Sequence, residues 1–368
     1  MGHRVMFVLP RMVSGGVERV TLNLMRALKA TGSDCTLALR QARGEMMEEA
    51  GALVETRELA AGGMLHFVPN LAAYIEEWKP THIVTAFADI GLLTHAALRK
   101  AGSQARLIHG VHDSHGPEVA RPGIGGRLRH VATNAMARAV YRRASAIVTV
   151  SDGARDELLA RFPVAPDRVR TIYNPVIDSS HLVARQKTGS SGIVRVVAVG
   201  RLARQKGFDV MVEAANGLRT SRRWVLDIHG DGPERSRLED DIRRLGLSDL
   251  VKLHGYTPTP MDAMRQADIF VLPSRHEGLP TVLIEALACQ TQIVATDCRH
   301  GPREILLGGK LGALVPVEDV AALRQALQDA IDGNDMVDPR ELLGRAEDFT
   351  VAASLTQWQS LFSELAAR

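Results

Sequence analysis

The chain has 368 residues, of which 45% are hydrophobic and 24% charged, and its formal net charge is +3. These values are ordinary for a globular protein, and the length allows two domains of roughly 150 residues each. The small net charge predicts no nucleic-acid partner, and no apolar run approaches the roughly 18 residues of a membrane span. The opening segment MGHRVMFVLP lacks the long apolar core of a cleavable leader.

In the first half, short apolar, β-branched runs alternate with amphipathic stretches, which predicts parallel sheets covered by helices. Strands are predicted at residues 4–9, 35–39, 82–86, 107–111 and 146–150, and helices between them include 17–30 and 71–78. The polar run QKTGSSG at 186–192 then predicts a linker.

The second half repeats the alternation, with strands predicted at 194–199, 224–229, 251–254, 269–272, 293–295 and 313–315. We therefore expect an α/β protein with two Rossmann-like, doubly wound domains at 1–186 and 187–350, and a final helix within 351–368. Two such halves enclose a cleft, and ligands of these sheets bind at the carboxyl ends of strands.

Basic residues concentrate in residues 121–143, and no acidic residue lies between Arg121 and Ser151. Apolar residues run through this segment at mostly helical spacing: Leu128, Val131, Ala135, Met136, Ala139 and Val140. A basic amphipathic helix suits an anionic membrane surface. A helix packed on the core with a solvated basic face has the same pattern.

The three cysteines, Cys35, Cys289 and Cys298, are widely spaced. They match no zinc-binding spacing, and an odd number argues against a disulfide framework. A reducing cytoplasm is the simplest location for such a chain.

The most informative segment is SRHEGLPTVLIEALA at 274–288, in which Glu277 and Glu285 flank a Gly-Leu-Pro turn that is predicted to open a helix. Gly278 permits a close backbone approach, and Pro280 suits the first helical position. Free amides at a helix start attract phosphate, whereas carboxylates suit sugar hydroxyls. The segment predicts a nucleotide-sugar site, although either glutamate alone is typical of a solvated surface.

This Glu-x7-Glu arrangement headed by EGLP resembles the retaining glycosyltransferases of family 4. The resemblance implies the GT-B fold and a final helix that packs back on the first half. It also implies that Glu277 contacts the hexose, that the backbone of Gly278 and Leu279 contacts the diphosphate, and that Glu285 holds the ribose hydroxyls.

A second resemblance to the family is the run GRLARQKG at 200–207, which follows a predicted strand. Spaced cations there suit a diphosphate, because arginine offers a fork of donors and lysine a point charge. The resemblance assigns that role to Arg201 and Lys206, and Arg204 is expected to be solvated. The alternative is that the three cations serve solubility alone.

The turn GDGP at 230–233 also resembles the family, in which Gly230 and Gly232 let the backbone approach the nucleotide; taken alone, such glycines suit any strand-to-helix turn. Asp227, His229 and Asp231 do not converge simply on a metal, because alternate strand residues point to opposite faces. We expect no metal and no cofactor, the nucleotide sugar being a co-substrate.

In the first half, Gly15 and Gly16 end the first strand and open a helix. The resemblance makes them contacts of the donor phosphate or the acceptor, whereas a tight turn alone explains them equally. The full Gly-x-Gly-x-x-Gly fingerprint is absent, which argues against a nicotinamide oxidoreductase.

Three histidines, His109, His112 and His115, end the strand at 107–111. The resemblance aligns His112 with a histidine close to the transferred sugar, where Asp113 can orient its ring. His109 is expected in the core and His115 in a loop.

The stretch TDCRHGPREI at 296–305 resembles a motif of a subset of these transferases. Its Gly-Pro turn and Glu304 are expected to cap the next helix.

Together these features predict a retaining, metal-independent hexosyltransferase of bacterial-type surface polysaccharide, lipopolysaccharide or glycolipid synthesis. The catalytic set is Arg201, Lys206, Glu277 and His112. The donor is a nucleotide-diphosphate hexose or N-acetylhexosamine, with UDP favoured and GDP-mannose open, and the acceptor is a glycan or a lipid-linked molecule. The alternatives are a nucleotide-sugar epimerase or hydrolase on the same fold and an inactive carbohydrate-binding subunit. The location is cytoplasmic, or peripheral on the inner face of the cell membrane.

Overall fold

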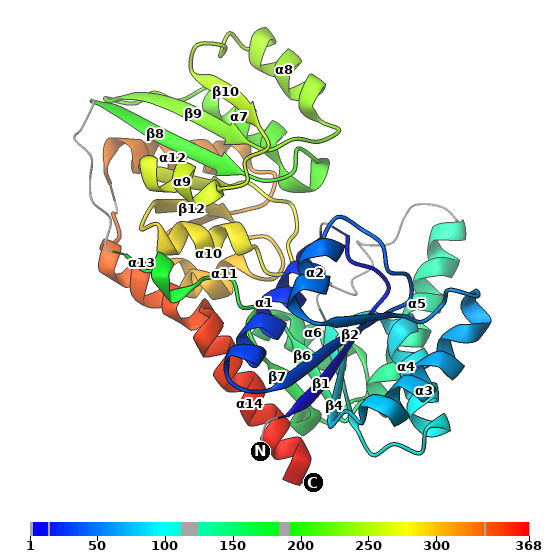
Figure 1. Ribbon diagram of the computed structural model, residues 1–368. Coiled ribbons are helices and arrows are strands. Elements are labelled where there is room, and N and C mark those ends of the chain that lie inside the picture. The colour runs from blue at the N-terminus through cyan, green and yellow to red at the C-terminus, as the bar shows by residue number, and fades with distance from the viewer. Residues whose placement is uncertain (1–2, 14, 112–123, 184–191, 335, 368) are drawn as a thin grey trace. The chain divides into compact units, whose positions relative to one another are not determined.

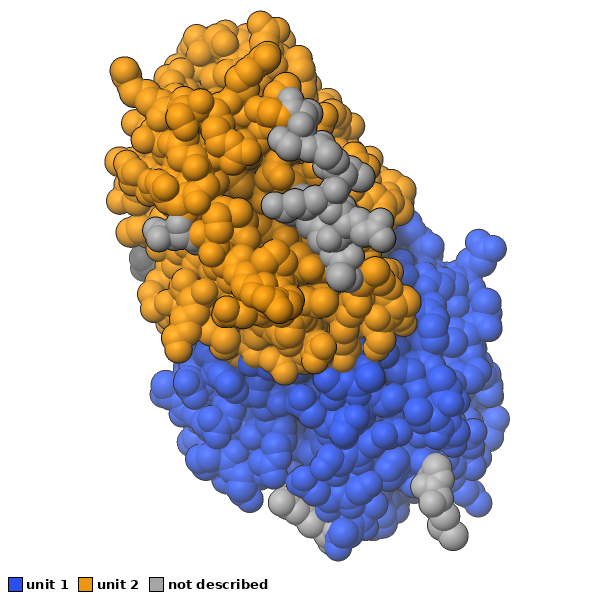
Figure 2. Space-filling view, turned by 90° about the vertical axis from the view of Figure 1, so that its left-hand side faces the viewer, with its two compact units in different colours: residues 1–175, 351–368 blue, residues 176–350 orange. Residues whose placement is uncertain are grey.

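The computed structural model describes residues 3–13, 15–111, 124–183, 192–334 and 336–367 (Figure 1). The chain forms two compact units: unit 1 holds residues 1–175 and 351–368, and unit 2 holds residues 176–350. Figure 2 gives each unit its own colour. Two α/β units, each built on a parallel sheet, confirm the predicted fold class.

The division between the units falls before the predicted boundary at residue 186. The backbone N–H groups of Val176 and Ile177 both donate to the carbonyl of Phe349, each at 3.2 Å, and this carbonyl belongs to unit 2. The carbonyl of Pro175 accepts instead from Asn23 of unit 1, at 3.1 Å. Hydrogen bonding therefore moves the boundary to residues 175 and 176. Most of the predicted linker, 186–191, lies outside the described residues.

Unit 1 contains a seven-stranded parallel sheet in the order β3-β2-β1-β4-β5-β6-β7. The strands are β1 (Arg4–Leu9), β2 (Asp34–Leu39), β3 (Glu55–Glu58), β4 (His82–Thr85), β5 (Arg106–Val111), β6 (Ala146–Thr149) and β7 (Val169–Thr171). The helices are α1 (Gly16–Ala30), α2 (Met47–Leu53), α3 (Phe67–Trp78), α4 (Ala88–Lys100), α5 (Ile124–Arg143), α6 (Asp152–Arg161) and α14 (Val351–Ala367).

Two strands of this sheet, β3 and β7, escape the sequence analysis. They are the two edge strands, and they are short and largely polar, reading ETRE and VRT. Short, charged edges protect a sheet from pairing with other chains, and they also remove the apolar signal by which a strand is recognised. The five inner strands were predicted to within one residue at either end.

The sheet of unit 1 separates two hydrophobic clusters, and alternate residues of β1 point into each of them. Met6 and Val8 pack with residues of α3, α4 and α5, whereas Phe7 packs with residues of α1 and α14. The residues that α14 adds to this second cluster are Trp358, Leu361, Phe362 and Leu365. The final helix is thus part of the core of unit 1.

Helix α5 contains most of the basic segment. In the part of this helix whose side chains are described, Ala137, Val140 and Tyr141 are buried, whereas Val131 is 65% exposed. Val131 and Ala135, two residues of the predicted apolar pattern, are exposed, and the helix packs on α4 and the core through other residues. No helix in the described part of the chain is long and apolar enough to cross a membrane.

Unit 2 contains a six-stranded parallel sheet in the order β10-β9-β8-β11-β12-β13. The strands are β8 (Ile193–Val199), β9 (Arg223–His229), β10 (Val251–Gly255), β11 (Ile269–Leu272), β12 (Gln292–Thr296) and β13 (Ala313–Val315). The helices are α7 (Phe208–Ala215), α8 (Arg235–Arg244), α9 (Pro260–Gln266), α10 (Thr281–Ala288), α11 (Pro302–Ile305), α12 (Val320–Asp332) and α13 (Pro339–Ala346).

We expect the substitution Phe362→Ala to lower the unfolding free energy of unit 1 by about 3–5 kcal/mol, because it empties a fully buried site in the core. Urea unfolding is followed by tryptophan fluorescence in a Trp224→Phe background, so that the emission comes from Trp78 and Trp358 of unit 1. The exposed Gln357→Ala on the same helix serves as the control and changes little. Equal effects of the two substitutions contradict a packed α14.

Candidate functional site

The order of strands in unit 2 creates a switch point between β8 and β11. From β8 the chain continues to β9 and β10 on one side, and from β11 to β12 and β13 on the other. Ligands of doubly wound sheets bind outside the carboxyl ends of strands at such a point. The loops that follow β8, β9 and β11 carry the predicted site residues of the second half.

The loops after β8 and β9 are in contact through glycines. Leu202 N–H donates to the carbonyl of Asp231 at 2.9 Å. A Cβ atom on Gly230 would lie 1.9 Å from the carbonyl oxygen of Gly200, and one on Gly232 would lie 2.4 Å from that of Leu202. The GDGP turn therefore requires its glycines for the approach of two loops, independently of any ligand.

The loops after β8 and β11 are joined by an ion pair. Lys206 Nζ donates to Glu277 Oε1 at 2.7 Å, and the buried Ser274 hydroxyl donates to the same oxygen at 2.5 Å. The side chains of Lys206 and Glu277 are only 19% and 7% exposed. Among the described residues Glu277 Oε2 has no hydrogen-bond partner, so it remains an acceptor for a ligand.

Gly207 fixes the distance between these loops. It follows the short 3-10 helix Arg204–Lys206 and has a φ of +65°, which favours glycine. A Cβ atom there would lie 2.0 Å from the carbonyl oxygen of Pro273. Any larger residue would push Lys206 away from Glu277.

The two loops joined by this pair also carry a further positive charge and unused donors. Arg201 is exposed, and its guanidinium makes no ion pair or hydrogen bond to the described residues. The backbone N–H groups of Gly278 and Leu279 likewise donate no hydrogen bond to any described residue. Such a group of donors suits an anion.

The start of helix α10 differs from the prediction by one residue. Pro280 is the N-cap rather than the first helical residue, and its carbonyl accepts from the N–H of Leu283 at 3.0 Å. Its missing N–H is harmless at either position.

Glu285 lies in α10, and its Oε2 atom is buried without a hydrogen-bond partner among the described residues. Burial raises the pKa of this carboxyl from 4.5 to about 7. A buried acceptor without a partner costs about 1–3 kcal/mol, so a ligand that donates a hydrogen bond here is favoured.

The stretch at 296–305 supports the Gly-Leu-Pro turn. Gly301, with a φ of +92°, is the N-cap of α11 and has no side-chain capping bond. A Cβ atom on Gly301 would lie 2.3 Å from Cδ of Pro280. The Gly-Pro turn does begin the helix as expected, with Gly301 as N-cap and Pro302 as the first helical residue, and the glycine also leaves room for the ring of Pro280.

The carboxylates of the GDGP strand and turn point elsewhere. Asp227 Oδ1 pairs with His254 Nε2 at 2.6 Å, and the His254 ring stacks on that of His229 with centroids 4.7 Å apart. Asp231 Oδ1 accepts from the N–H of Gly232. Within the described residues no group of three or more His, Cys, Asp or Glu side chains is arranged to hold a metal ion.

The predicted residues of unit 1 are only partly described. Gly15 is the N-cap of α1, and the buried carboxylate of Glu18 lies so close that a Cβ atom on Gly15 would be 2.4 Å from it. Gly16 has open space around it. His109 is buried and bonded to the Thr85 hydroxyl at 2.9 Å.

His112, Asp113 and His115 lie outside the described residues, as does Arg121. The proximity of His112 to the transferred sugar stays a prediction.

The sequence analysis did not single out Ser274 or Tyr256. Ser274 donates a hydrogen bond to Glu277. In the sequence, the only indication of this role is that Ser274 lies just after a predicted strand and three residues before Glu277. Tyr256 is 79% exposed and follows Gly255, whose carbonyl accepts from the N–H of Gly230 at 2.6 Å.

Two Rossmann-like units and a site rich in cations and amides at a switch point define a GT-B glycosyltransferase. The family model described as Glycosyl transferases group 1 matches residues 184–346, and that of Glycosyltransferase Family 4 matches residues 14–179. The chain belongs to this family of glycosyltransferases.

Among its relatives, an exopolysaccharide phosphotransferase of Streptomyces coelicolor is 30% identical over 293 residues, which are 77% of this chain but only 29% of that protein. The N-acetylgalactosamine-N,N'-diacetylbacillosaminyl-diphospho-undecaprenol 4-alpha-N-acetylgalactosaminyltransferase of Campylobacter jejuni is 26% identical over 332 residues, 88% of each chain. The structure of HepE of Anabaena in complex with UDP has a TM-score of 0.81 and 19% identity, over 98% of this chain and 100% of that one, and it shares the fold.

The raised pKa of Glu285 predicts a pH-dependent stability. A carboxyl whose pKa is higher in the folded chain stabilises the fold fully below pH 4.5, and this stabilisation is lost as the pH rises to about 7. Each pKa unit between the unfolded and the folded value changes the unfolding free energy by about 1.4 kcal/mol. We expect Glu285→Gln to remove this loss, so that the variant is more stable than the wild type at pH 8.

Urea unfolding between pH 5 and pH 8, followed by circular dichroism, measures this difference. Glu341→Gln, which neutralises an exposed glutamate of unit 2, is the matched control and keeps the wild-type profile. A Glu285→Gln profile parallel to that of the wild type contradicts the raised pKa.

Proposed function

We propose that the chain is a retaining, metal-independent transferase of a hexose or N-acetylhexosamine from a nucleotide-diphosphate sugar, with UDP as the favoured nucleotide. The observation that carries the proposal is the group of Lys206, Glu277 and the unused amides of Gly278 and Leu279 in one site of unit 2. The complex of HepE with UDP supports a uridine nucleotide.

In this proposal the diphosphate binds to Lys206, Arg201 and the amides after Glu277. Lys206 then exchanges the Glu277 carboxylate for a diphosphate oxygen, so its positive charge stays compensated. Glu277 is released to accept hydrogen bonds from hydroxyls of the sugar. Donors already in place stabilise the charge that develops on the leaving diphosphate, which is usually a large catalytic contribution.

Glu285 would hold the ribose of the same donor. Ribose hydroxyls supply the hydrogen bonds that its buried Oε2 lacks, and they favour the ionised carboxylate. Bound nucleotide therefore lowers the pKa of Glu285, and the exposed ring of Tyr256 is available to stack on the base.

Retention follows from a front-face path. The bond between C1 of the sugar and the diphosphate oxygen breaks, the acceptor oxygen bonds to C1 on the same face, and the leaving phosphate takes the acceptor's proton. Both carboxylates of the described site, Glu277 and Glu285, already have roles, so no protein nucleophile is assigned. Arg201 and Lys206 supply the positive charge that a metal ion supplies in other transferases.

The acceptor is proposed to be a glycan or a lipid-linked molecule in the synthesis of a surface polysaccharide or glycolipid. The undecaprenol-linked substrate in the name of the Campylobacter relative supports this class. Helix α5 has exposed arginines, Arg138 and Arg142, and the exposed Val131. These suit an anionic surface, and we propose a cytoplasmic protein that associates peripherally with the inner face of the cell membrane. Gly15, Gly16 and His112 keep their proposed contacts with acceptor or donor.

Thermal unfolding with UDP, GDP, ADP or NAD tests the donor site. We expect UDP to raise the midpoint with or without EDTA, because a ligand at a hundred times its Kd adds about 2.7 kcal/mol. Lys206→Ala loses most of this shift, whereas Arg204→Ala, which removes an exposed cation of the same loop, retains it. A shift with NAD alone, or a UDP shift that EDTA abolishes, contradicts the proposal.

Transfer is tested with radiolabelled UDP-sugars and an undecaprenyl-diphosphate glycan as acceptor. We expect an acceptor-dependent product with an α-linked sugar, and turnover roughly 10²–10³-fold lower in Lys206→Ala, because the leaving charge loses a preorganised donor. The anomeric configuration is read by nuclear magnetic resonance. Consumption of donor at the same rate without any acceptor indicates an epimerase or hydrolase instead.

A further inference from the structure

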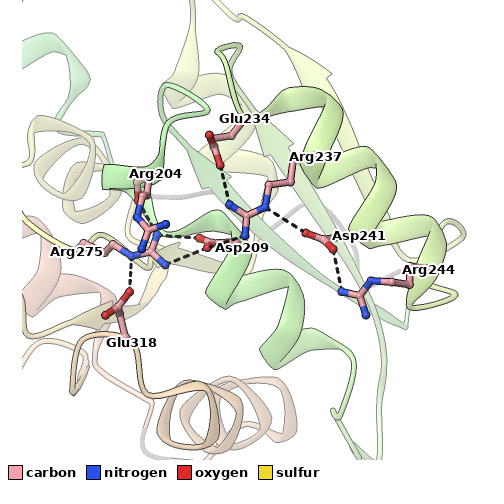
Figure 3. A network of polar contacts seen from close by, with 8 residues as sticks. All are labelled: Arg204, Asp209, Glu234, Arg237, Asp241, Arg244, Arg275 and Glu318. Carbon is pink, nitrogen blue, oxygen red and sulfur yellow. Dashed lines mark hydrogen bonds and ion pairs between the residues drawn. The ribbon is translucent and has the colours of Figure 1, made fainter.

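Arg275 occupies a central position that the proposed mechanism does not use. It stands between Ser274 and Glu277 in the loop after β11, and its side chain is only 15% exposed. Its guanidinium donates to Asp209 Oδ1 at 2.8 Å and Oδ2 at 3.0 Å, and to Glu318 Oε1 at 2.7 Å (Figure 3). A largely shielded, fully engaged arginine here requires an explanation.

Arg275 also bonds to the loop that carries Lys206. Its Nη1 donates to the carbonyl of Arg204 at 2.6 Å, and its backbone N–H donates to the carbonyl of Gln205 at 2.8 Å. The Gln205 side chain returns a bond to the carbonyl of His276 at 2.9 Å. The residues directly before Lys206 are thus fastened to those directly before Glu277.

The outer anchors of Arg275 lie at or near the starts of two helices. Asp209 lies in the first turn of α7, and Glu318 lies just before α12. Burial raises the pKa of Asp209, but the hydrogen bonds and charge of Arg275 outweigh this and hold the pKa below its usual value. The hydrogen bonds that Arg275 donates to Asp209 in turn raise the pKa of Arg275. The pair is charged throughout the working range of pH.

The geometry of these bonds requires arginine. A planar guanidinium can bind a carboxylate bidentately while a third nitrogen bonds elsewhere, and lysine cannot reproduce this fork. Asp209 has a second basic neighbour, Arg237, but this lies 3.9 Å away, is 55% exposed and bonds mainly to Glu234. In Figure 3 the side chain of Arg275 lies between Arg204 of the Lys206 loop, Asp209 and Glu318.

We propose that Arg275 is a positioning residue, which holds the loops of Lys206 and Glu277 together so that both meet the nucleotide sugar without rearrangement. This inference rests on the proposed function of that site. Misplacement of a site group by about 1 Å can reduce a rate a hundredfold, so a fixed spacing has a direct effect on the ligand.

The affinity for UDP, measured by calorimetry on the full chain, tests this role through a double-mutant cycle. We expect Arg275→Gln and Lys206→Ala each to weaken UDP binding about tenfold, and the double variant to be within about twofold of Lys206→Ala. The loss is shared because Arg275 acts through the position of Lys206. Arg275→Lys is expected to resemble Arg275→Gln, since it keeps the charge but loses the fork.

Arg237→Gln is the matched control, because it removes an arginine from the same network without touching either loop; its UDP affinity stays within twofold of the wild type. If Arg275 only stabilises the fold, Arg275→Gln lowers the melting temperature but leaves the UDP affinity unchanged. If Arg275 acts independently of Lys206, the losses of affinity in the double variant are additive. Either result overturns the inference. Where Arg275→Gln does not fold, Asp209→Asn in the same two backgrounds gives the same cycle. No binding of UDP or GDP by the wild type overturns the proposed function itself.

Discussion

The ion pair between Lys206 and Glu277 is the interaction on which the candidate site depends. Two opposite charges with little exposure to water are costly to bury, and they are tolerated only with further hydrogen bonds. Ser274 supplies one such bond, and the close contact at Gly207 keeps the loops at the required distance. The pair therefore combines a structural function with a readiness to exchange partners when an anion arrives.

This dependence explains why the site lies where the sheet divides. Between β8 and β11 the following helices leave in opposite directions, so two loops can meet without a helix between them. Unused donors and acceptors then collect at one point: the amides of Gly278 and Leu279 for an anion, and Glu285 for a hydroxyl. The hydrogen-bond partners that these groups lack within the chain indicate which ligand groups the site can bind.

The sequence predicted much of this architecture, because inner strands carry a strong apolar signal and the EGLP and GRLARQKG segments place their residues directly after strands. It did not predict what depends on distant partners. The unit boundary is set by bonds of Val176 and Ile177 to Phe349, and the edge strands have no apolar pattern. The several bonds of Arg275 join three segments far apart in the chain, at residues 204–209, 275 and 318, and no local pattern reveals them.

The discontinuity of unit 1 has a consequence for the order in which the protein is made. Its first 175 residues leave the ribosome early, but Trp358 and Phe362 of its core belong to the last segment. During synthesis an apolar groove along α1 therefore stays open while all of unit 2 is translated. Unit 1 can be completed only after unit 2 has been translated, so nascent chains expose this surface for longer than domain order alone suggests.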